Sequence, residues 1–255
     1  MNTHRFFVSA YYRFRDASVR ILGYDAVTRR RLGRRDEWKR LGSESCGWLT
    51  PQVWEVPEPT CYCVGAGEDI SFDLALAKEY GAVVLILDPT PRSAELVQRT
   101  LGSDYASVDF RPWALWVNDG DVWLYEPRDS SHVSHSIVNL QGTSGGFRAA
   151  ARTLDSIAAE FGHASIDLLK MDIEGADYSV LEQILDTGVP VGIIEVEFDE
   201  LSWPRRGAHG RIRRAVDRLE KQGYKLRRVD SGNNYTFRHE RYTAAGWTRE
   251  RNNST

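Results

Sequence analysis

A glycine turn between an apolar strand and a helix, followed by a second strand that ends in aspartate, most constrains the fold of this chain. Residues 60–64 read as a short strand that stops at Gly65-Ala66-Gly67, and residues 70–80 carry apolar side chains at helical spacing. Glycine lets the backbone turn tightly and approach a ligand closely. Asp88, 21 residues after Gly67, ends the next apolar run. This order predicts a cradle for a nucleotide-type cofactor, in which the Asp88 carboxylate accepts hydrogen bonds from two ribose hydroxyls.

Length and composition favour one large globular domain. The chain has 255 residues, of which 42% are hydrophobic, so it can bury a sizeable core. Its three cysteines, Cys46, Cys61 and Cys63, show neither zinc-site spacing nor a disulfide framework. No stretch approaches the roughly 20 apolar residues that a membrane-spanning helix needs. We therefore expect a cytoplasmic protein that has no membrane partner.

Positive charge is concentrated near the N-terminus. The formal net charge is only −3, but residues 1–41 hold eleven Arg or Lys against four Asp or Glu. Aromatic and aliphatic residues alternate with these charges, which favours a helical face packed on the main domain over a nucleic-acid-binding arm. Contact with an acidic substrate or with a partner subunit, as in a homodimer, stays open. We predict a basic helical arm at 1–46, the main domain at 47–240 and a polar tail at 241–255.

The remaining patterns alternate between strand and helix. The predicted strands are 106–117, 122–125, 166–171, 191–198, 224–229 and 235–238, and the predicted helices are 93–101, 153–161, 176–185 and 209–222. A turn at 118–121 is expected to send 122–125 back antiparallel, and the polar segment 126–146 is long enough for a functional loop. These elements predict a doubly wound, Rossmann-like α/β sheet that is mostly parallel, with an antiparallel C-terminal strand and the N-terminal helical arm.

Two features argue against a nicotinamide cofactor. Ile70 stands where the dinucleotide fingerprint has its third glycine. The last two predicted strands form an antiparallel hairpin around the turn residues 230–234. Dinucleotide dehydrogenase domains mostly stay parallel to their last strand, whereas a reversed final strand is characteristic of methyltransferases that use S-adenosylmethionine.

Four segments carry a resemblance to a known family. They read VGAGEDISFD at 64–73, DPTP at 88–91, LKMDIEGADY at 169–178 and NYTF at 234–237. Together they resemble the FkbM family of S-adenosylmethionine-dependent methyltransferases, over roughly residues 48–238. The Lys-x-Asp-Ile-Glu-Gly part of the third segment is the most specific.

The resemblance implies a class I methyltransferase domain that methylates mostly hydroxyl groups of sugars or secondary metabolites, with S-adenosylmethionine as its cofactor. The residues expected to contact this cofactor are Gly65, Ala66, Gly67, Asp69, Ser71, Asp88, Thr90, Trp113, Ala114 and Asp172. The chain departs from the broader class at Cys63, where an acidic residue often holds the methionine amino group. That contact would then come from Asp69, Asp172 or backbone carbonyls.

Methyl transfer to an alcohol places two demands on a site. The acceptor oxygen must lie about 3 Å from the methyl carbon and in line with the departing sulfur. The hydroxyl proton must also leave, which calls for a neighbouring base or metal. The candidate catalytic residues are Asp172 at the end of one parallel strand, Glu197 at the end of the next, and His135 in the polar loop. We expect Trp48, His135 and Glu174 to contact the acceptor.

Two further residues, His132 and Lys170, are weaker candidates for a catalytic role. His132 is a second imidazole in the same loop, but Ser134 and Ser136 surround His135 with groups that could orient its ring. Lys170 is expected to neutralise a buried carboxylate rather than to catalyse.

A metal site is an alternative to a metal-free one. Glu195 and Glu197 alternate onto one face of their strand and would act as a pair. Asp172, Glu197 and His135 would offer ligands to Mg²⁺ or another divalent ion, but their spacing is not diagnostic. We expect no required metal.

The main interpretation is an O-methyltransferase that acts on a small molecule or glycoside, with nucleic acid as an unfavoured partner. The same scaffold would also support N-methylation of an amine or peptide, because a fold does not fix the acceptor atom. A non-enzymatic nucleic-acid-binding module would use the basic arm and bind with steep salt dependence. A nicotinamide oxidoreductase is the third rival, and it would bind NAD.

Overall fold

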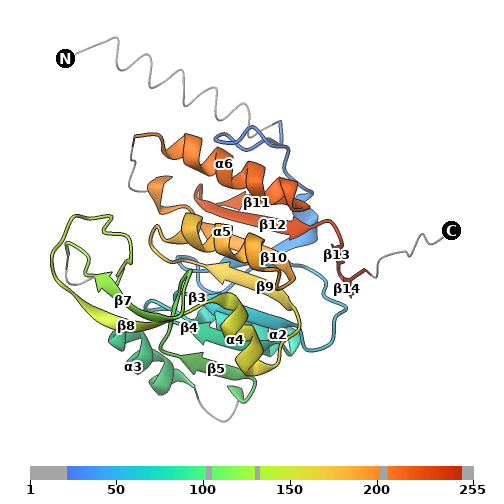
Figure 1. Ribbon diagram of the computed structural model, residues 1–255. Coiled ribbons are helices and arrows are strands. Elements are labelled where there is room, and N and C mark those ends of the chain that lie inside the picture. Colours follow the sequence, from blue (N-terminus) through green and yellow to red (C-terminus); the bar gives the residue numbers. More distant parts are fainter. Residues whose placement is uncertain (1–21, 102–104, 130–132, 202–205, 249–255) are drawn as a thin grey trace.

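The protein is built on a seven-stranded central sheet, with helices on both of its faces (Figure 1). The computed structural model describes residues 22–101, 105–129, 133–201 and 206–248. The strands of the central sheet are β3 (Thr60–Val64), β4 (Val83–Leu87), β5 (Val108–Arg111), β9 (Ile166–Met171), β10 (Val191–Glu197), β11 (Tyr224–Asp230) and β12 (Asn234–His239).

Five α-helices, two 3-10 helices and seven short strands accompany the central sheet in the described residues. The α-helices are α2 (Ser71–Tyr80), α3 (Pro91–Thr100), α4 (Leu154–Phe161), α5 (Asp177–Thr187) and α6 (Ala208–Lys221), and the 3-10 helices are η1 (Arg35–Glu37) and η3 (Asp199–Leu201). The short strands are β1 (Trp38–Leu41), β2 (Trp48–Pro51), β6 (Ala114–Leu115), β7 (Gly120–Tyr125), β8 (Gly146–Arg152), β13 (Tyr242–Thr243) and β14 (Gly246–Trp247). None of the described helices is long and apolar enough to cross a membrane.

The strand order of the central sheet is β11-β12-β10-β9-β3-β4-β5. Strands β5, β4, β3, β9 and β10 pair in parallel, while β12 is antiparallel to both β10 and β11. The predicted doubly wound sheet with a reversed C-terminal strand is confirmed. The chain leaves β3 toward β4 on one side and later returns to β9 on the other. Open α/β sheets bind their ligands at the carboxyl ends of the strands at such a switch point.

Each face of the sheet carries its own apolar cluster. On one face α4, α5 and α6 bury Ile157, Val180 and Val216 against the sheet. On the other face α2 and α3 bury Phe72 and Val97. Because both faces are covered, the central strands are nearly continuous apolar runs, and β9 is buried along its whole length.

The predicted strand at 106–117 is wrong, because the chain there divides between two sheets. Strand β5 ends at Arg111 in the central sheet, and β6 starts at Ala114 in a three-stranded sheet of order β6-β8-β7. Pro112 lies between them and has no backbone N–H for a strand ladder. The predicted pairing of 122–125 with the preceding strand is also wrong, since β7 pairs antiparallel with β8, which lies beyond the polar loop.

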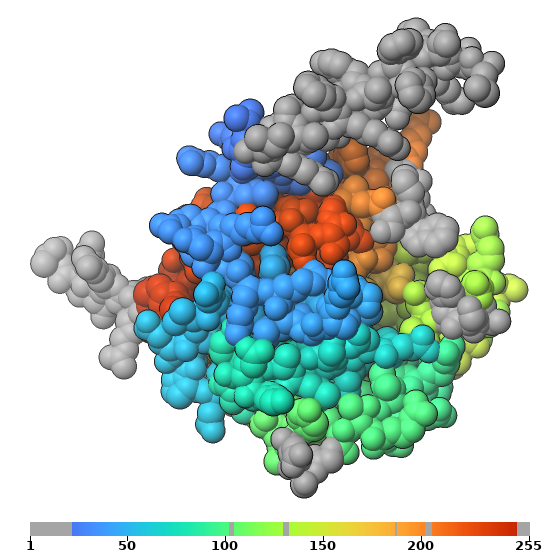
Figure 2. Space-filling view, turned by 180° about the vertical axis from the view of Figure 1, so that it is seen from behind, coloured from blue at the N-terminus to red at the C-terminus, as the bar shows by residue number. Residues whose placement is uncertain are grey.

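The described part of the predicted N-terminal arm is not α-helical. Residues 1–21 lie outside the described residues, and the segment 22–46 forms turns, η1 and β1 instead. Strand β1 pairs antiparallel with β2 across the predicted boundary at 46/47, and it buries Trp38 against the α2 face of the sheet. Seen from behind, this blue segment covers the molecule next to the teal surface of α2 (Figure 2). Trp38 thus belongs to the core, whereas Tyr24 is exposed.

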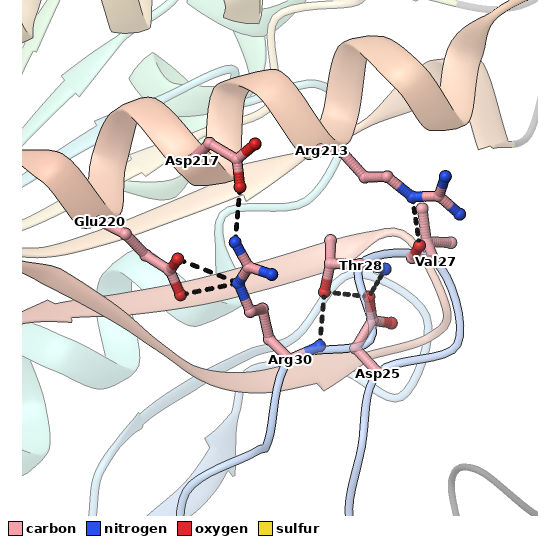
Figure 3. A network of polar contacts seen from close by, with 7 residues as sticks. All are labelled: Asp25, Val27, Thr28, Arg30, Arg213, Asp217 and Glu220. Atoms are coloured by element: carbon pink, nitrogen blue, oxygen red, sulfur yellow. Dashed lines mark hydrogen bonds and ion pairs between the residues drawn. The ribbon is translucent and has the colours of Figure 1, made fainter.

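Polar contacts tie the segment before η1 to the C-terminal half of the chain (Figure 3). Asp25 is buried, and its Oδ2 atom accepts hydrogen bonds from the backbone N (2.6 Å) and Oγ1 (2.7 Å) of Thr28. The hydroxyl of Tyr235 on β12 also donates to Asp25, at 3.3 Å. Arg30 instead forms a partly exposed ion pair with Glu220 on α6, at 2.9 Å.

These two anchors should differ in strength. We expect Asp25→Ala to lower the free energy of unfolding by about 3 kcal/mol, because the Thr28 and Tyr235 donors lose a buried charged acceptor. Arg30→Ala should cost less than about 1 kcal/mol, since its ion pairs are exposed to solvent. Urea unfolding followed by circular dichroism measures both. Equal losses in the two variants would contradict this ranking.

Candidate functional site

A cavity of about 360 Å³ opens at the carboxyl ends of β3, β4 and β9. The β6-β8-β7 sheet forms one wall, through Ala114, Leu115 and Leu124. The predicted site residues that line the cavity are Trp48, Gly65, Ala66, Gly67, Asp69, Asp88, Thr90, Ala114, His135, Asp172, Glu174 and Glu197. The cavity therefore lies at the switch point of the sheet, where ligands of open α/β proteins bind.

The glycine turn is shaped by close contact between two strands. Gly65 has a φ of +86°, and a Cβ atom on it would lie 2.1 Å from the carbonyl oxygen of Asp172. The backbone N of Asp172 donates to the carbonyl of Val64 at 3.1 Å, which joins the ends of β9 and β3. Gly67 has a φ of +54°, but a Cβ there would only touch Val133, at 3.9 Å. Position 65 thus requires glycine because any Cβ there would collide with the Asp172 carbonyl, whereas position 67 favours glycine only because of its positive φ.

The Asp88 carboxylate holds the glycine turn against the end of β4. Its Oδ2 atom accepts hydrogen bonds from the backbone N of Ala66 (2.9 Å) and of Gly67 (3.1 Å). Its Oδ1 atom accepts from the backbone N (2.8 Å) and Oγ1 (2.7 Å) of Thr90. Carboxylate oxygens have about four lone-pair sites in total, and these four hydrogen bonds use them, so a ligand hydroxyl would have to share or displace one of the bonds of the turn. The predicted ribose contact stays a prediction.

Asp69 places a second carboxylate at the N-terminus of α2. Its Oδ1 atom accepts a hydrogen bond from the backbone N of Ser71 at 2.7 Å. Burial works to raise the pKa of Asp69, but hydrogen bonds from Ser43 and Ser71 outweigh it and lower that pKa. The side chain is therefore an anion that lines the cavity. Ser71 itself does not line the cavity, and its hydroxyl accepts from the backbone N of Ser43 at 2.7 Å.

Lys170 brings a buried positive charge to the floor of the cavity. Its Nζ atom donates to the carbonyl oxygen of Gly65 and lies 5.4 Å from the centre of the Trp48 ring. Burial alone would lower the pKa of Lys170, but the carboxylates of Asp172 and Asp73 raise it above the ordinary value. The lysine thus remains charged and compensates nearby acids, in agreement with its predicted role.

The acids at the ends of β9 and β10 are difficult to ionise. Burial raises the pKa of Asp172, and the charge of Asp88 raises it further against the opposing effect of Lys170. Burial also raises the pKa of Glu197 to about 8, and its Oε1 atom accepts a hydrogen bond from Asn233 at 2.5 Å. The predicted pairing of Glu195 with Glu197 at the cavity does not occur, because Glu195 is fully buried and lies outside the lining.

His135 enters the cavity from the polar loop with a defined ring orientation. Its Nδ1 atom lies 3.0 Å from the carbonyl oxygen of Val133, which can only accept a hydrogen bond, so Nδ1 carries the proton. Phe147 contacts the ring edge-on, with 5.3 Å between the ring centres. The Nε2 atom is thereby left as the acceptor of the imidazole. His132, the second candidate, lies outside the described residues.

Trp113 does not reach the cavity, unlike its neighbour Ala114. It packs against the apolar cluster of the α4–α6 face, and the guanidinium of Arg152 lies 5.1 Å from its ring centre. Trp113 precedes the short strand β6, whose two residues, Ala114 and Leu115, line the cavity instead. Sequence reasoning in turn missed Leu124 and Asn234, which line the cavity. The NYTF segment at 234–237 could have pointed to Asn234. No sequence pattern pointed to Leu124, because its place at the cavity depends on the pairing of β7 with β8.

The two glycines provide a matched test of the turn. We expect Gly65→Ala to lower the free energy of unfolding by about 3 kcal/mol, because strain adds to an overpacked contact with β9. Gly67→Ala should cost only about 1 kcal/mol, from the left-handed conformation alone. Thermal unfolding of both variants measures the difference. A Gly65→Ala variant as stable as Gly67→Ala would show that the contact with Asp172 relaxes freely.

Comparisons with known proteins show the family of the chain. The chain matches the family described as Methyltransferase FkbM domain over residues 64–226, more than half of its length. It is 30% identical over 146 residues to "Probable methyltransferase-like protein 24" of Rattus norvegicus and of Homo sapiens, a match that covers 56% of this chain and 33% of each relative. The chain thus spans about a third of the length of these curated relatives.

Two solved structures are similar at low sequence identity. The fibrillarin pre-rRNA processing protein of Methanococcus jannaschii is 10% identical with a TM-score of 0.43, and the match covers 72% of this chain and 68% of that one. A TehB-like SAM-dependent methyltransferase of Corynebacterium glutamicum is 13% identical with a TM-score of 0.36, covering 72% and 81%. By its family match and the architecture of its sheet, the chain belongs to the FkbM family of S-adenosylmethionine-dependent methyltransferases.

Proposed function

We propose that this protein transfers a methyl group from S-adenosylmethionine to a hydroxyl group of a small molecule or sugar. One observation carries the proposal: the cavity joins the glycine turn and Asp88 on one side to His135 and the carboxyl groups of β9 and β10 on the other. The first side suits a nucleoside, and the second suits proton removal from an acceptor. Both therefore face the same ligand space.

The residues of the first side fit the cofactor. Asp88 lines the cavity beside the glycine turn, where ribose hydroxyls would share its carboxylate with the backbone donors, and the apolar wall at Ala114 and Leu115 suits an adenine ring. Asp69 offers an anion to the methionine ammonium group, the role that Cys63 cannot fill. When bound, S-adenosylmethionine supplies a methyl group activated by its sulfonium.

The second side suits an alcohol acceptor. As the acceptor oxygen bonds to the methyl carbon, the carbon–sulfur bond breaks and the hydroxyl proton must pass to a base. The unprotonated Nε2 atom of His135 can take that proton, because the Val133 carbonyl fixes the opposite tautomer. Asp172 and Glu197 lie on the same side and would orient the acceptor. Trp48 and Glu174 offer a stacking face and a polar group to a sugar.

N-methylation is the second candidate, and one observation favours it. Several carboxyl groups line the cavity near Lys170, and Lys170 is the one lysine or arginine among the lining residues that the structure describes. Such a site would attract a cationic amine. Mass spectrometry of the methylated product distinguishes the acceptor atom.

Cofactor binding tests the first half of the proposal. Calorimetry should detect binding of S-adenosylhomocysteine and none of NAD. We expect Asp88→Ala to weaken that binding about 100-fold, because the ribose contacts and the support of the glycine turn are lost together. The control Glu95→Ala, an exposed carboxylate on α3, should bind as the wild type does. Tight binding of NAD alone would refute the enzyme class.

Proton removal tests the second half. We expect His135→Ala to lower kcat by about 100-fold or more while the affinity for S-adenosylhomocysteine changes less than about twofold, since a general base acts only in the chemical step. Turnover is followed as S-adenosylhomocysteine release, with an acceptor found by screening glycosides and hydroxylated small molecules. The exposed His209 on α6 offers the matched control His209→Ala. Full turnover in His135→Ala would remove this residue from the mechanism.

A further inference from the structure

Three carboxyl groups meet where β9 and β10 end. Asp172 follows β9, Glu174 lies in the loop after it, and Asp199 lies in η3, just after β10. One carboxylate oxygen from each lies within 4.8 Å of the other two. Oxygens bind Mg²⁺ at about 2.1 Å and Ca²⁺ at about 2.4 Å, so two ligands on opposite sides of one ion lie about 4.2–4.8 Å apart. The three groups therefore already stand at the spacing of ligands to one ion.

A fourth acid behind this cluster lacks the partners that a buried charge needs. Asp177 is only 1% exposed, and neither of its carboxylate oxygens has a hydrogen-bond partner among the described residues. Asp177 is the first residue of α5, three positions after Glu174, and the charges of Asp172, Glu197 and Glu174 act on it. Unpaired buried carboxyl groups are costly. Asp177 therefore indicates a missing positive charge.

Asp199 is left in a similar state, although its neighbour is not. Its Oδ2 atom is buried without a hydrogen-bond partner in the described part of the chain, and the charges that act on Asp199 include Asp177 and Glu174. Glu200, the next residue, is also buried but pairs with Arg211 on α6 at 2.7 Å and accepts from Tyr178 at 3.0 Å. The fold thus supplies cations and donors to Glu200 and not to Asp199.

Lys170 compensates Asp172, one acid of the cluster. Its Nζ atom donates to the Gly65 carbonyl, and among the cluster acids its charge is felt by Asp172. One lysine therefore faces an excess of negative groups.

We propose that Asp172, Glu174 and Asp199 bind one divalent cation of the Mg²⁺, Mn²⁺ or Ca²⁺ class, with Asp177 supplying negative charge from behind. Carboxylate oxygens are the donors that hard cations prefer. These ligands differ from the metal site considered from the sequence, which consisted of Asp172, Glu197 and His135. Glu174 and Asp199 take the places of Glu197 and His135. His135 is thereby free to act as a base.

The position of this cation connects it with catalysis. Asp172 and Glu174 line the methyl-transfer cavity, so coordination positions not filled by protein face the ligand space. A cation there would bind the acceptor oxygen and lower the pKa of the acceptor hydroxyl. This role rests on the proposed function, whereas binding of the ion does not.

Manganese binding to the full chain tests the site without any methyl acceptor. After treatment with EDTA and its removal, electron paramagnetic resonance should show one Mn²⁺ bound per chain, and saturating Mg²⁺ or Ca²⁺ should displace it. We expect Glu174→Gln and Asp199→Asn each to weaken Mn²⁺ binding about 10- to 100-fold. The control Glu182→Gln changes an exposed carboxylate on α5 that pairs with Arg218 on α6, and it should bind Mn²⁺ normally.

Thermal unfolding supplies a second measurement. Mn²⁺ should raise the Tm of the wild type, because it binds only the folded chain. Asp177→Asn should diminish this rise while the metal-free variant stays folded, since the substitution removes an unpaired buried charge.

The proposal is overturned if the wild type binds no stoichiometric Mn²⁺ at millimolar concentration. It is equally overturned if Glu174→Gln, whose partly exposed side chain is the safer variant for folding, binds Mn²⁺ as the wild type does. Calorimetry with S-adenosylhomocysteine alone is run beside these titrations. Loss of that binding would refute the proposed function and leave the metal result standing, so the two failures are distinguishable.

Discussion

The close approach of β3 to β9 at Gly65 is the contact on which the site depends. The carbonyl oxygen of Asp172 occupies the space that any Cβ on Gly65 would fill. This contact brings the turn that suits a nucleoside directly beside the acids at the end of β9. It also positions the Gly65 carbonyl to accept from Lys170, which carries a buried charge across the floor of the cavity. A side chain at position 65 would separate the two halves of the site.

Asp88 links the fold to ligand binding through one carboxylate. Its oxygens accept four hydrogen bonds from the glycine turn and from Thr90, so the turn keeps its shape before a ligand arrives. Such preorganisation reduces the ordering that binding would otherwise require. The same carboxylate lines the cavity, so the proposed function gives one acid at the end of β4 a role in both structure and binding.

Charge is distributed unevenly around the central sheet. Parallel strands end at a common edge, and the loops that follow β9 and β10 carry acids to it. Arg211 neutralises Glu200 on the side that faces α6, but Asp177 and Asp199 receive no such partner among the described residues. Because unpaired carboxyl groups in a buried setting are costly, the excess is better explained by a ligand cation than by stability. The fold therefore concentrates carboxyl groups where the chemistry of the cavity is proposed to occur.

Local sequence determined the elements whose patterns are complete within a few residues. Strand β3 coincides with the predicted strand 60–64, and the terminal hairpin formed as expected, because periodicity and turn residues act over short distances. The sequence also placed Gly65, Asp88 and Asp172 at one edge, since the carboxyl ends of parallel strands meet there. Only the tertiary structure decided that β8 joins β6 and β7, that Trp113 packs away from the cavity, and that Asp177 stands behind Asp199. These outcomes depend on contacts between segments distant in the chain, which no local pattern records.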